Sequence, residues 1–139
     1  MRDKFYRIDE SCEYVQEIDG VTMNLIDACG CVIVEVTNSS EAPFVVDMSY
    51  KLYQLTDGDY VELYDAANDK SPFYVREIID GVGDEDVVVE DTNVFVVMPD
   101  KTFMIIRYPE TNSVDDVGDY RIEISGFELD YKVYEDYAW

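Results

Sequence analysis

Hydrophobic and polar residues alternate most regularly between residues 44 and 52. Every second position in this segment carries a large apolar side chain, and polar residues such as Lys51 stand between them. Such alternation is typical of a half-buried β-strand, because successive side chains point to opposite faces of a sheet. Residues 56–59 follow as a turn signal in which Gly58 can adopt a positive φ, and residues 60–64 alternate again. The pattern predicts a β-hairpin, around which we expect the other strands to pack.

Shorter runs of β-type residues occupy the rest of the chain, separated by turns rich in Gly, Pro, Asn and Asp. These runs are residues 4–9, 13–18, 21–26, 31–37, 73–79, 87–89, 94–98, 102–108, 120–124 and 127–134. Residues 31–37 are apolar on both faces as far as Glu35, which predicts a central strand. Residues 21–26 have mixed periodicity and fit either a strand or a helical turn. No segment has the pattern of an amphipathic helix, so the sequence predicts an all-β, antiparallel two-sheet sandwich or jelly roll of about ten strands.

The length of 139 residues, with no linker or low-complexity segment, indicates a single β-sandwich domain spanning residues 1–139. Hydrophobic residues make up 47% of the chain, which excludes intrinsic disorder despite the charge. Residues 1–20 lack the apolar stretch of a signal peptide, and the longest apolar runs are too short to cross a bilayer. We therefore expect a cytoplasmic protein with no membrane partner.

The charge balance is extreme. The chain has 32 acidic and 10 basic residues and no histidine, which gives a formal net charge of −22. Direct binding of nucleic acid is not expected, because Lys and Arg supply most of that affinity by neutralising phosphates. Without histidine there is no Ser-His or Cys-His nucleophile pair and no histidine metal ligand. Pairs of carboxylates can act as a catalytic acid and base, but among 32 acidic residues some pair will always have a suitable separation, so such pairs do not indicate an active site. We therefore predict a non-enzymatic protein without a cofactor.

Many of the acidic residues fall in two blocks that contain no Lys or Arg. Nine lie between residues 8 and 50, and eight lie from residue 77 to residue 100. Neighbouring cations cannot neutralise these blocks locally, and self-repulsion of this kind destabilises a folded chain. We predict that the blocks supply an acidic partner-binding patch. Its expected members are Asp9, Glu10, Glu13, Glu17, Asp80, Asp84, Glu85, Asp86, Glu90 and Asp91.

Such a charge exceeds what solubility requires, since a net charge of magnitude roughly 2–8 suffices for a small domain. The leading hypothesis is a nucleic-acid mimic, whose carboxylates imitate phosphates and occupy the basic groove of a DNA- or RNA-binding enzyme. In size, acidity and lack of a cysteine framework the chain resembles phage anti-restriction and anti-CRISPR proteins, which implies the host cell cytoplasm. Two alternatives remain open: an ordinary acidic protein from an acidic proteome such as a halophile's, and a structural or adhesion subunit with solubilising charge.

The segment DYVELYDA at residues 59–66 resembles the DYVEIYDG signature of CUB domains, and residues 44–52 and 102–108 resemble the strands around it. The resemblance implies an extracellular β-sandwich that binds proteins or other ligands, in some members with calcium. Lys51 stands where calcium-binding members carry a glutamate, and no cysteine follows Cys31 to form the second CUB disulfide. Residues 117–124 also resemble the last strand of bacterial pre-peptidase C-terminal sandwiches. A CUB-like binding module, with or without calcium, is therefore the alternative function.

Two groups of carboxylates are candidates for a divalent cation, although neither has the spacing of an EF-hand loop. They are Asp57, Asp59 and Asp65 in the predicted hairpin, and Asp80, Asp84, Glu85 and Asp86 beyond it. The three cysteines Cys12, Cys29 and Cys31 are expected to be buried free thiols, with three thiolates on zinc as the alternative. Asn38 begins a glycosylation sequon, which matters only in a secreted chain.

Overall fold

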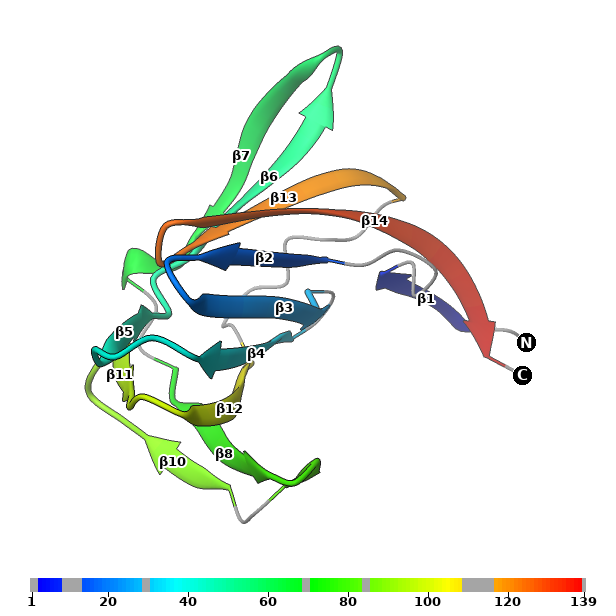
Figure 1. Ribbon diagram of the computed structural model, residues 1–139. Coiled ribbons are helices and arrows are strands. Elements are labelled where there is room, and N and C mark those ends of the chain that lie inside the picture. The colour runs from blue at the N-terminus through cyan, green and yellow to red at the C-terminus, as the bar shows by residue number, and fades with distance from the viewer. Residues whose placement is uncertain are drawn as a thin grey trace.

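The computed structural model describes residues 3–8, 14–28, 31–68, 71–83, 86–108 and 117–138, with only the backbone described for residues 3–7, 68 and 135–138. These residues form β-strands and a single turn of 3-10 helix, η1 (Ala66–Asn68), and they contain no α-helix (Figure 1). The strands are β1 (Asp3–Ile8), β2 (Val15–Ile18), β3 (Val21–Asp27), β4 (Val32–Asn38), β5 (Phe44–Asp47), β6 (Lys51–Thr56), β7 (Asp59–Asp65), β8 (Phe73–Ile79), β9 (Val82–Gly83), β10 (Val87–Val89), β11 (Val94–Val97), β12 (Lys101–Arg107), β13 (Gly118–Ile124) and β14 (Phe127–Ala138). The predicted all-β class is confirmed.

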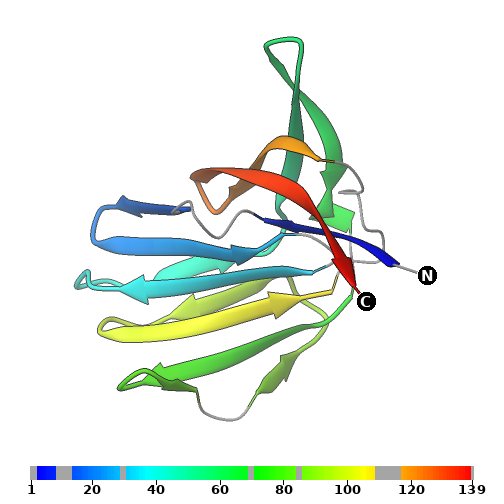
Figure 2. The same cartoon turned by 90° about the vertical axis from the view of Figure 1, so that its right-hand side faces the viewer.

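The strands pair antiparallel in two large sheets and one small one. A five-stranded sheet has the order β1-β14-β13-β6-β7, and a seven-stranded sheet has the order β10-β8-β12-β4-β3-β2 with β9 beside β8. The small sheet joins β11 to β5. In Figure 2, β13 and β14 lie above the row formed by β2, β3, β4, β12 and β8, as in a sandwich. β4 is a central strand with neighbours on both sides, as its apolar sequence predicts, and residues 21–26 belong to a strand, β3.

The hydrophobic core lies between the two large sheets, because alternate residues of each sheet point inward. Its most completely buried members include Met23, Val34, Val36, Phe73, Ile105, Tyr120, Ile122, Ile124, Phe127 and Tyr131. Among the described side chains, the only buried residues that carry a strongly polar group apart from tyrosine are Asn38 and Arg107. No helix that is long and apolar enough to span a bilayer occurs among the described residues.

The prediction of one continuous strand over residues 44–52 is only half right. Its apolar positions face the core as expected, with Val46, Met48, Tyr50 and Leu52 buried and Phe44 half-buried, but the chain is not in a strand from residue 48 to residue 50. Here it crosses from β5 in the small sheet to β6 in the five-stranded sheet. The backbone N–H of Met48 therefore donates to the carbonyl of Asn93 at 2.7 Å, and the carbonyl of Tyr50 accepts from the N–H of Ala66 at 2.8 Å. Alternation reports which side chains face the core, but not which sheet the backbone has joined.

The predicted hairpin exists as β6 and β7, joined by a two-residue turn in which both Asp57 (φ 53°) and Gly58 (φ 85°) have positive φ. Such turns match the twist of the strands they connect. The expectation that the other strands pack around this hairpin is wrong, because its tip projects away from the body (Figure 1). Tyr60, Val61 and Leu63 of β7 are exposed. The hairpin is a peripheral arm at the edge of the five-stranded sheet.

Candidate functional site

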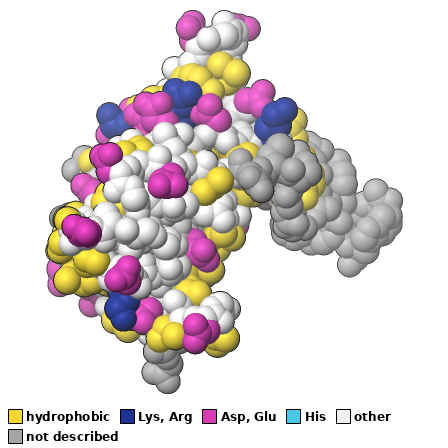
Figure 3. Space-filling view, viewed as in Figure 1, with side chains coloured by type: hydrophobic (Ala, Val, Ile, Leu, Met, Phe, Trp, Pro, Cys, Tyr) yellow, Lys and Arg dark blue, Asp and Glu magenta, His cyan; other side chains and the backbone are white. Residues whose placement is uncertain are grey.

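The carboxylates lie at the surface of the molecule. Every acidic side chain that the structure describes is at least partly exposed, and Arg107 is the one buried charged residue among the described side chains. On the face shown in Figure 3, Asp and Glu side chains are spaced apart over several elements, with few Lys or Arg between them. The acidity of the sequence is therefore displayed as a distributed array of exposed charges.

Four of the predicted patch residues lie along one edge of the seven-stranded sheet, where β10 is the outermost strand. Asp80 lies in the turn between β8 and β9, Asp86 precedes β10, and Glu90 and Asp91 follow it. All four side chains are exposed. We call Asp80, Asp86, Glu90 and Asp91 the acidic edge. Asp84 and Glu85, which the sequence also predicts here, lie outside the described residues.

The structure does not bring the first acidic block to the acidic edge. Glu17 is exposed on β2, which lies at the opposite end of the same sheet from β10. The other predicted members of the first block, Asp9, Glu10 and Glu13, lie outside the described residues. The sheet order separates the two groups because β2 and β10 are the two outermost strands. Sequence alone could not show this, since each block is acidic whatever the strand order.

Three of the described basic side chains pair with carboxylates that do not belong to the acidic edge, and so they do not neutralise it. Lys51 pairs with Glu62 at 3.8 Å, and Lys101 pairs with Glu77 at 3.8 Å. Arg121 binds Asp130 at 2.6 Å and Glu128 at 3.7 Å.

On the acidic edge, Arg76 donates two hydrogen bonds to Asp86, at 2.8 and 3.1 Å. These hydrogen bonds hold the pKa of Asp86 below its ordinary value. None of the ion pairs among the described residues involves Asp80, Glu90 or Asp91. Three of the four carboxylates on the acidic edge therefore remain without a described cation beside them.

In the described part of the chain, no group of three or more Asp, Glu or Cys side chains is arranged to hold an ion. Of the two carboxylate candidates, the group of Asp80, Asp84, Glu85 and Asp86 includes two residues outside the described ones, so this finding applies to Asp57, Asp59 and Asp65. In the β6–β7 arm, Asp65 accepts a hydrogen bond from the N–H of Ala67 at 2.9 Å. Asp65 also stands opposite Lys51 in the strand register, and a cation there opposes a dication. The carboxylates of this arm are therefore a poor calcium site.

Cys31 is a free, half-buried thiol that lies 3.6 Å from the carboxylate of Asp27 and donates to it. Burial, and then the negative charge of Asp27, raises the pKa of Cys31 to about 11. The thiol is therefore protonated at neutral pH, whereas a zinc ligand must be a thiolate. Cys12 and Cys29, the other two cysteines of the zinc alternative, lie outside the described residues.

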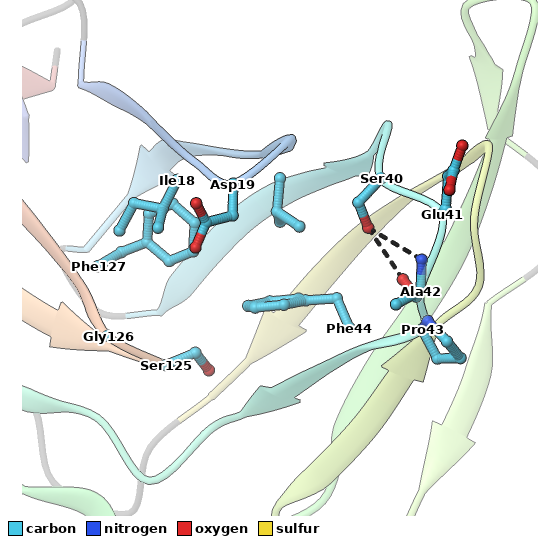
Figure 4. Close-up of a pocket in the computed structure, with 11 residues that line it drawn as sticks. Ile18, Asp19, Ser40, Glu41, Ala42, Pro43, Phe44, Ser125, Gly126 and Phe127 are labelled. Carbon is cyan, nitrogen blue, oxygen red and sulfur yellow. Dashed lines mark hydrogen bonds between the residues drawn. The ribbon is translucent and has the colours of Figure 1, made fainter.

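A pocket of about 430 Å³ opens at one end of the sandwich, where three tight connections meet. These are residues 19–20 between β2 and β3, residues 40–43 between β4 and β5, and residues 125–126 between β13 and β14. Figure 4 shows the ring of Phe44 between the Ser40–Pro43 connection and the side chains of Asp19 and Phe127. We call this cavity the end pocket.

Buried hydrogen bonds fix the rim of the end pocket. The side-chain amide of Asn38 donates to the carbonyls of Ala42 and Val97, each at 2.9 Å, and its oxygen accepts from Ser40. Asn38 is fully buried, so the sequon that it begins is not accessible in the folded chain. The N–H of Ser39 donates to the carbonyl of Gly20 at 2.8 Å, which ties two of the three connections together.

The end pocket combines an apolar floor with acidic side chains. Phe44 and Phe127 form an edge-to-face pair with ring centroids 6.0 Å apart, and Ile18 and Val21 also line the cavity. Among its described lining residues, the charged ones are Asp19 and Glu41, both exposed. No pattern in the sequence indicated this pocket. The one signal that the sequence offered was that both acids belong to the first base-free block.

The described chain is thus a strongly acidic β-sandwich with an acidic edge and an end pocket. No protein-family model and no curated protein matches it. Among solved structures, it is similar to the nucleoside dehydratase Pac13, at 11% identity over 94% of this chain and 88% of that chain, with a TM-score of 0.20. A Streptomyces PAC13 variant with uridine gives 12% identity over 95% and 89%, again with a TM-score of 0.20. Scores this low support no argument about fold or activity.

Proposed function

We propose that this is a non-enzymatic protein that inhibits a DNA- or RNA-binding protein by occupying its basic groove in place of nucleic acid. The observation that carries the proposal is the acidic edge, where Asp80, Glu90 and Asp91 are exposed and no described cation pairs with them. Phage-encoded anti-defence proteins act in the host cytoplasm, and that setting is part of the proposal.

The backbone of the acidic edge is suited to holding charges in fixed positions. Residues 87–89 of β10 pair with residues 73–75 of β8, and β9 pairs with the other end of β8. Asp80 (φ 54°) and Asp91 (φ 62°) both lie in the left-handed region, which tight turns require. A carboxylate in a short connection held between paired strands loses less conformational freedom on binding than one on a flexible tail.

The same charges would also speed the encounter with a basic partner. A net charge of −22 attracts a positive groove over a distance that is set by ionic strength. In contact, arginine side chains of the partner would form charge-assisted hydrogen bonds with the carboxylates, as they do with phosphates.

The CUB-like alternative has one observation in its favour. The segment that carries the resemblance forms β7 on the peripheral arm, where exposed Tyr60, Val61 and Leu63 offer apolar contacts to a partner. This alternative predicts binding through the arm. Substituting these three residues with serine would abolish such binding and leave a complex made through the acidic edge intact.

Competition with nucleic acid tests the proposed function. The protein is immobilised, and a basic nucleic-acid-binding partner is captured on it. The affinity of the protein for this partner is then measured at increasing concentrations of duplex DNA, of RNA and of NaCl. We expect nucleic acid to compete for the partner, and the affinity to fall steeply between about 50 and 200 mM salt. A captured partner whose affinity is unchanged by both nucleic acid and salt would contradict the proposal.

A further inference from the structure

The lining of the end pocket specifies a ligand with two unlike parts. Phe44 and Ile18 provide apolar surface, whereas Phe127 is buried and packs edge-to-face against Phe44. The ionisable groups among the described lining residues are the carboxylates of Asp19 and Glu41. An anion would meet like charge at this rim. A purely apolar ligand would gain nothing from the two exposed carboxylates. A ligand with a cation on an apolar stem can contact the apolar lining with its stem and a carboxylate with its charge.

The two carboxylates are placed differently in the pocket. In Figure 4 the carboxylate of Asp19 is on the side of the pocket where Ile18 and Phe127 are drawn, and that of Glu41 points away from the ring of Phe44. The hydroxyl of Ser125, on the third side, is already engaged with β5, since it accepts from the N–H of Asp47 at 2.6 Å. Asp19 is therefore the carboxylate best placed for a group that lies on the aromatic floor.

A second copy of this chain is a poor occupant. Two chains that each carry a formal charge of −22 repel one another, and eight of the eleven described lining residues belong to the block of residues 8–50 that lacks Lys and Arg. The charge of the chain instead favours a basic protein. Arginine and lysine side chains on such a protein have the required form, because each carries a cation on a three- or four-carbon stem.

We infer that the end pocket binds an arginine or lysine side chain of a basic partner protein, with the stem against Phe44 and Ile18 and the cation on Asp19. This inference rests on the proposed function, because it assigns the pocket to the same kind of partner. It adds a second, shape-dependent contact to the charge contact at the acidic edge. Of the two side chains, arginine fits better, because its planar guanidinium stacks on aromatic rings and pairs with a carboxylate through two N–H groups.

Small probes test the pocket without any partner. Nα-acetyl-arginine methylamide is titrated into the isotopically labelled full chain, and backbone amide shifts are followed by NMR. We expect shifts concentrated at residues 18–21, 40–44 and 125–127. The neutral analogue Nα-acetyl-citrulline methylamide, and guanidinium chloride at the same ionic strength, should each bind at least about threefold more weakly, because one lacks the charge and the other lacks the stem.

Two substitutions form a matched pair. Asp19 (φ 51°) and Asp57 (φ 53°) both occupy the first position of an Asp-Gly hairpin turn. Asn accepts the same conformation, so Asp19→Asn and Asp57→Asn remove one charge each without changing the turn. We expect Asp19→Asn to weaken binding of the arginine probe by roughly threefold to tenfold, and Asp57→Asn to change it less than about 1.5-fold.

Three results would overturn the inference. They are equal affinity for the arginine and citrulline probes, equal weakening by the two substitutions, and tighter binding of free agmatine than of the capped arginine, which would assign the pocket to a small amine. None of these measurements involves nucleic acid or a partner. Probe binding can therefore fail while competition at the acidic edge succeeds, and the reverse, so the two proposals are tested separately.

Discussion

At the scale of single residues, Arg107 determines how three connections meet inside the sandwich. Its guanidinium donates to the carbonyl of Met48 at 2.8 Å, to that of Ser71 at 2.9 Å and to the side-chain oxygen of Asn93 at 2.7 Å. It also lies 5.8 Å from the centre of the Phe73 ring. The buried carbonyl groups of irregular backbone need donors, and one planar guanidinium supplies several.

Replacing Arg107 should therefore be costly. We expect Arg107→Met to lower the free energy of unfolding by about 3 kcal/mol, because it leaves buried acceptors without donors. The control is Lys132→Met at an exposed position, with an expected change within about 0.5 kcal/mol. Urea unfolding followed by circular dichroism measures both. Equal, small changes in the two variants would show that Arg107 does not hold these connections.

Cys31 provides a residue-scale prediction about pH. Its folded pKa of about 11 lies above the ordinary 9.0, mainly through burial and then through Asp27. A raised folded pKa means that the protonated thiol stabilises the fold fully below about pH 9, and that this contribution is lost as the pH rises through 11. We expect the thiolate fraction at pH 8 to be on the order of 100-fold lower in the folded chain than in urea.

Iodoacetamide labelling measures this difference, with tandem mass spectrometry to assign the modified cysteine. Asp27→Asn should speed labelling of folded Cys31 by removing one of the causes of the raised pKa. A labelling rate in the native chain that titrates near pH 9 would contradict the assigned environment.

At the scale of elements, the sequence predicted the turn at residues 57–58 and most of the inward-facing residues, because both depend on local pattern. Asp57-Gly58 is a turn signal that the structure confirms with positive φ at both residues, and Asp80-Gly81 likewise has positive φ at both residues between β8 and β9. The break at residues 48–50 was not predictable, since it depends on contacts with residues far away in the chain. The same holds for the end pocket, whose rim depends on the buried hydrogen bonds of Asn38 to Val97 and Ala42.

Two glycines test whether the β6–β7 arm is peripheral. Gly58 and Gly126 both have φ 85°, and a Cβ on either would meet nothing within 4 Å. Alanine at each position should cost roughly 1–2 kcal/mol locally, because the left-handed conformation is unfavourable for it. We expect Gly126→Ala, between β13 and β14, to lower global stability by about that amount.

In contrast, Gly58→Ala should mainly speed hydrogen exchange in β6 and β7, with a smaller loss of global stability. Denaturant unfolding and native-state hydrogen exchange distinguish the two variants. Equal global losses would mean that the arm unfolds together with the core.

At the scale of the whole molecule, composition predicted that the surface is acidic but not how it is divided. Exposed carboxylates occur throughout the described chain, as their hydration requires. The strand order places Glu17 on β2 and the acidic edge beside β10, at opposite ends of one sheet. The proposed function therefore depends on the acidic edge rather than on the total charge, and substitutions at the edge can be compared with substitutions elsewhere that change the net charge equally.

The most direct test compares two triple variants that change the net charge equally. One neutralises the acidic edge (Asp80→Asn, Glu90→Gln and Asp91→Asn), and the other neutralises exposed aspartates elsewhere (Asp57→Asn, Asp59→Asn and Asp119→Asn). For each variant, the affinity for the partner that nucleic acid displaces is measured at fixed ionic strength. Our account predicts that the edge variant loses at least about tenfold more affinity than the other variant, as expected when several contacting charge pairs are removed. Equal losses in the two variants would contradict it.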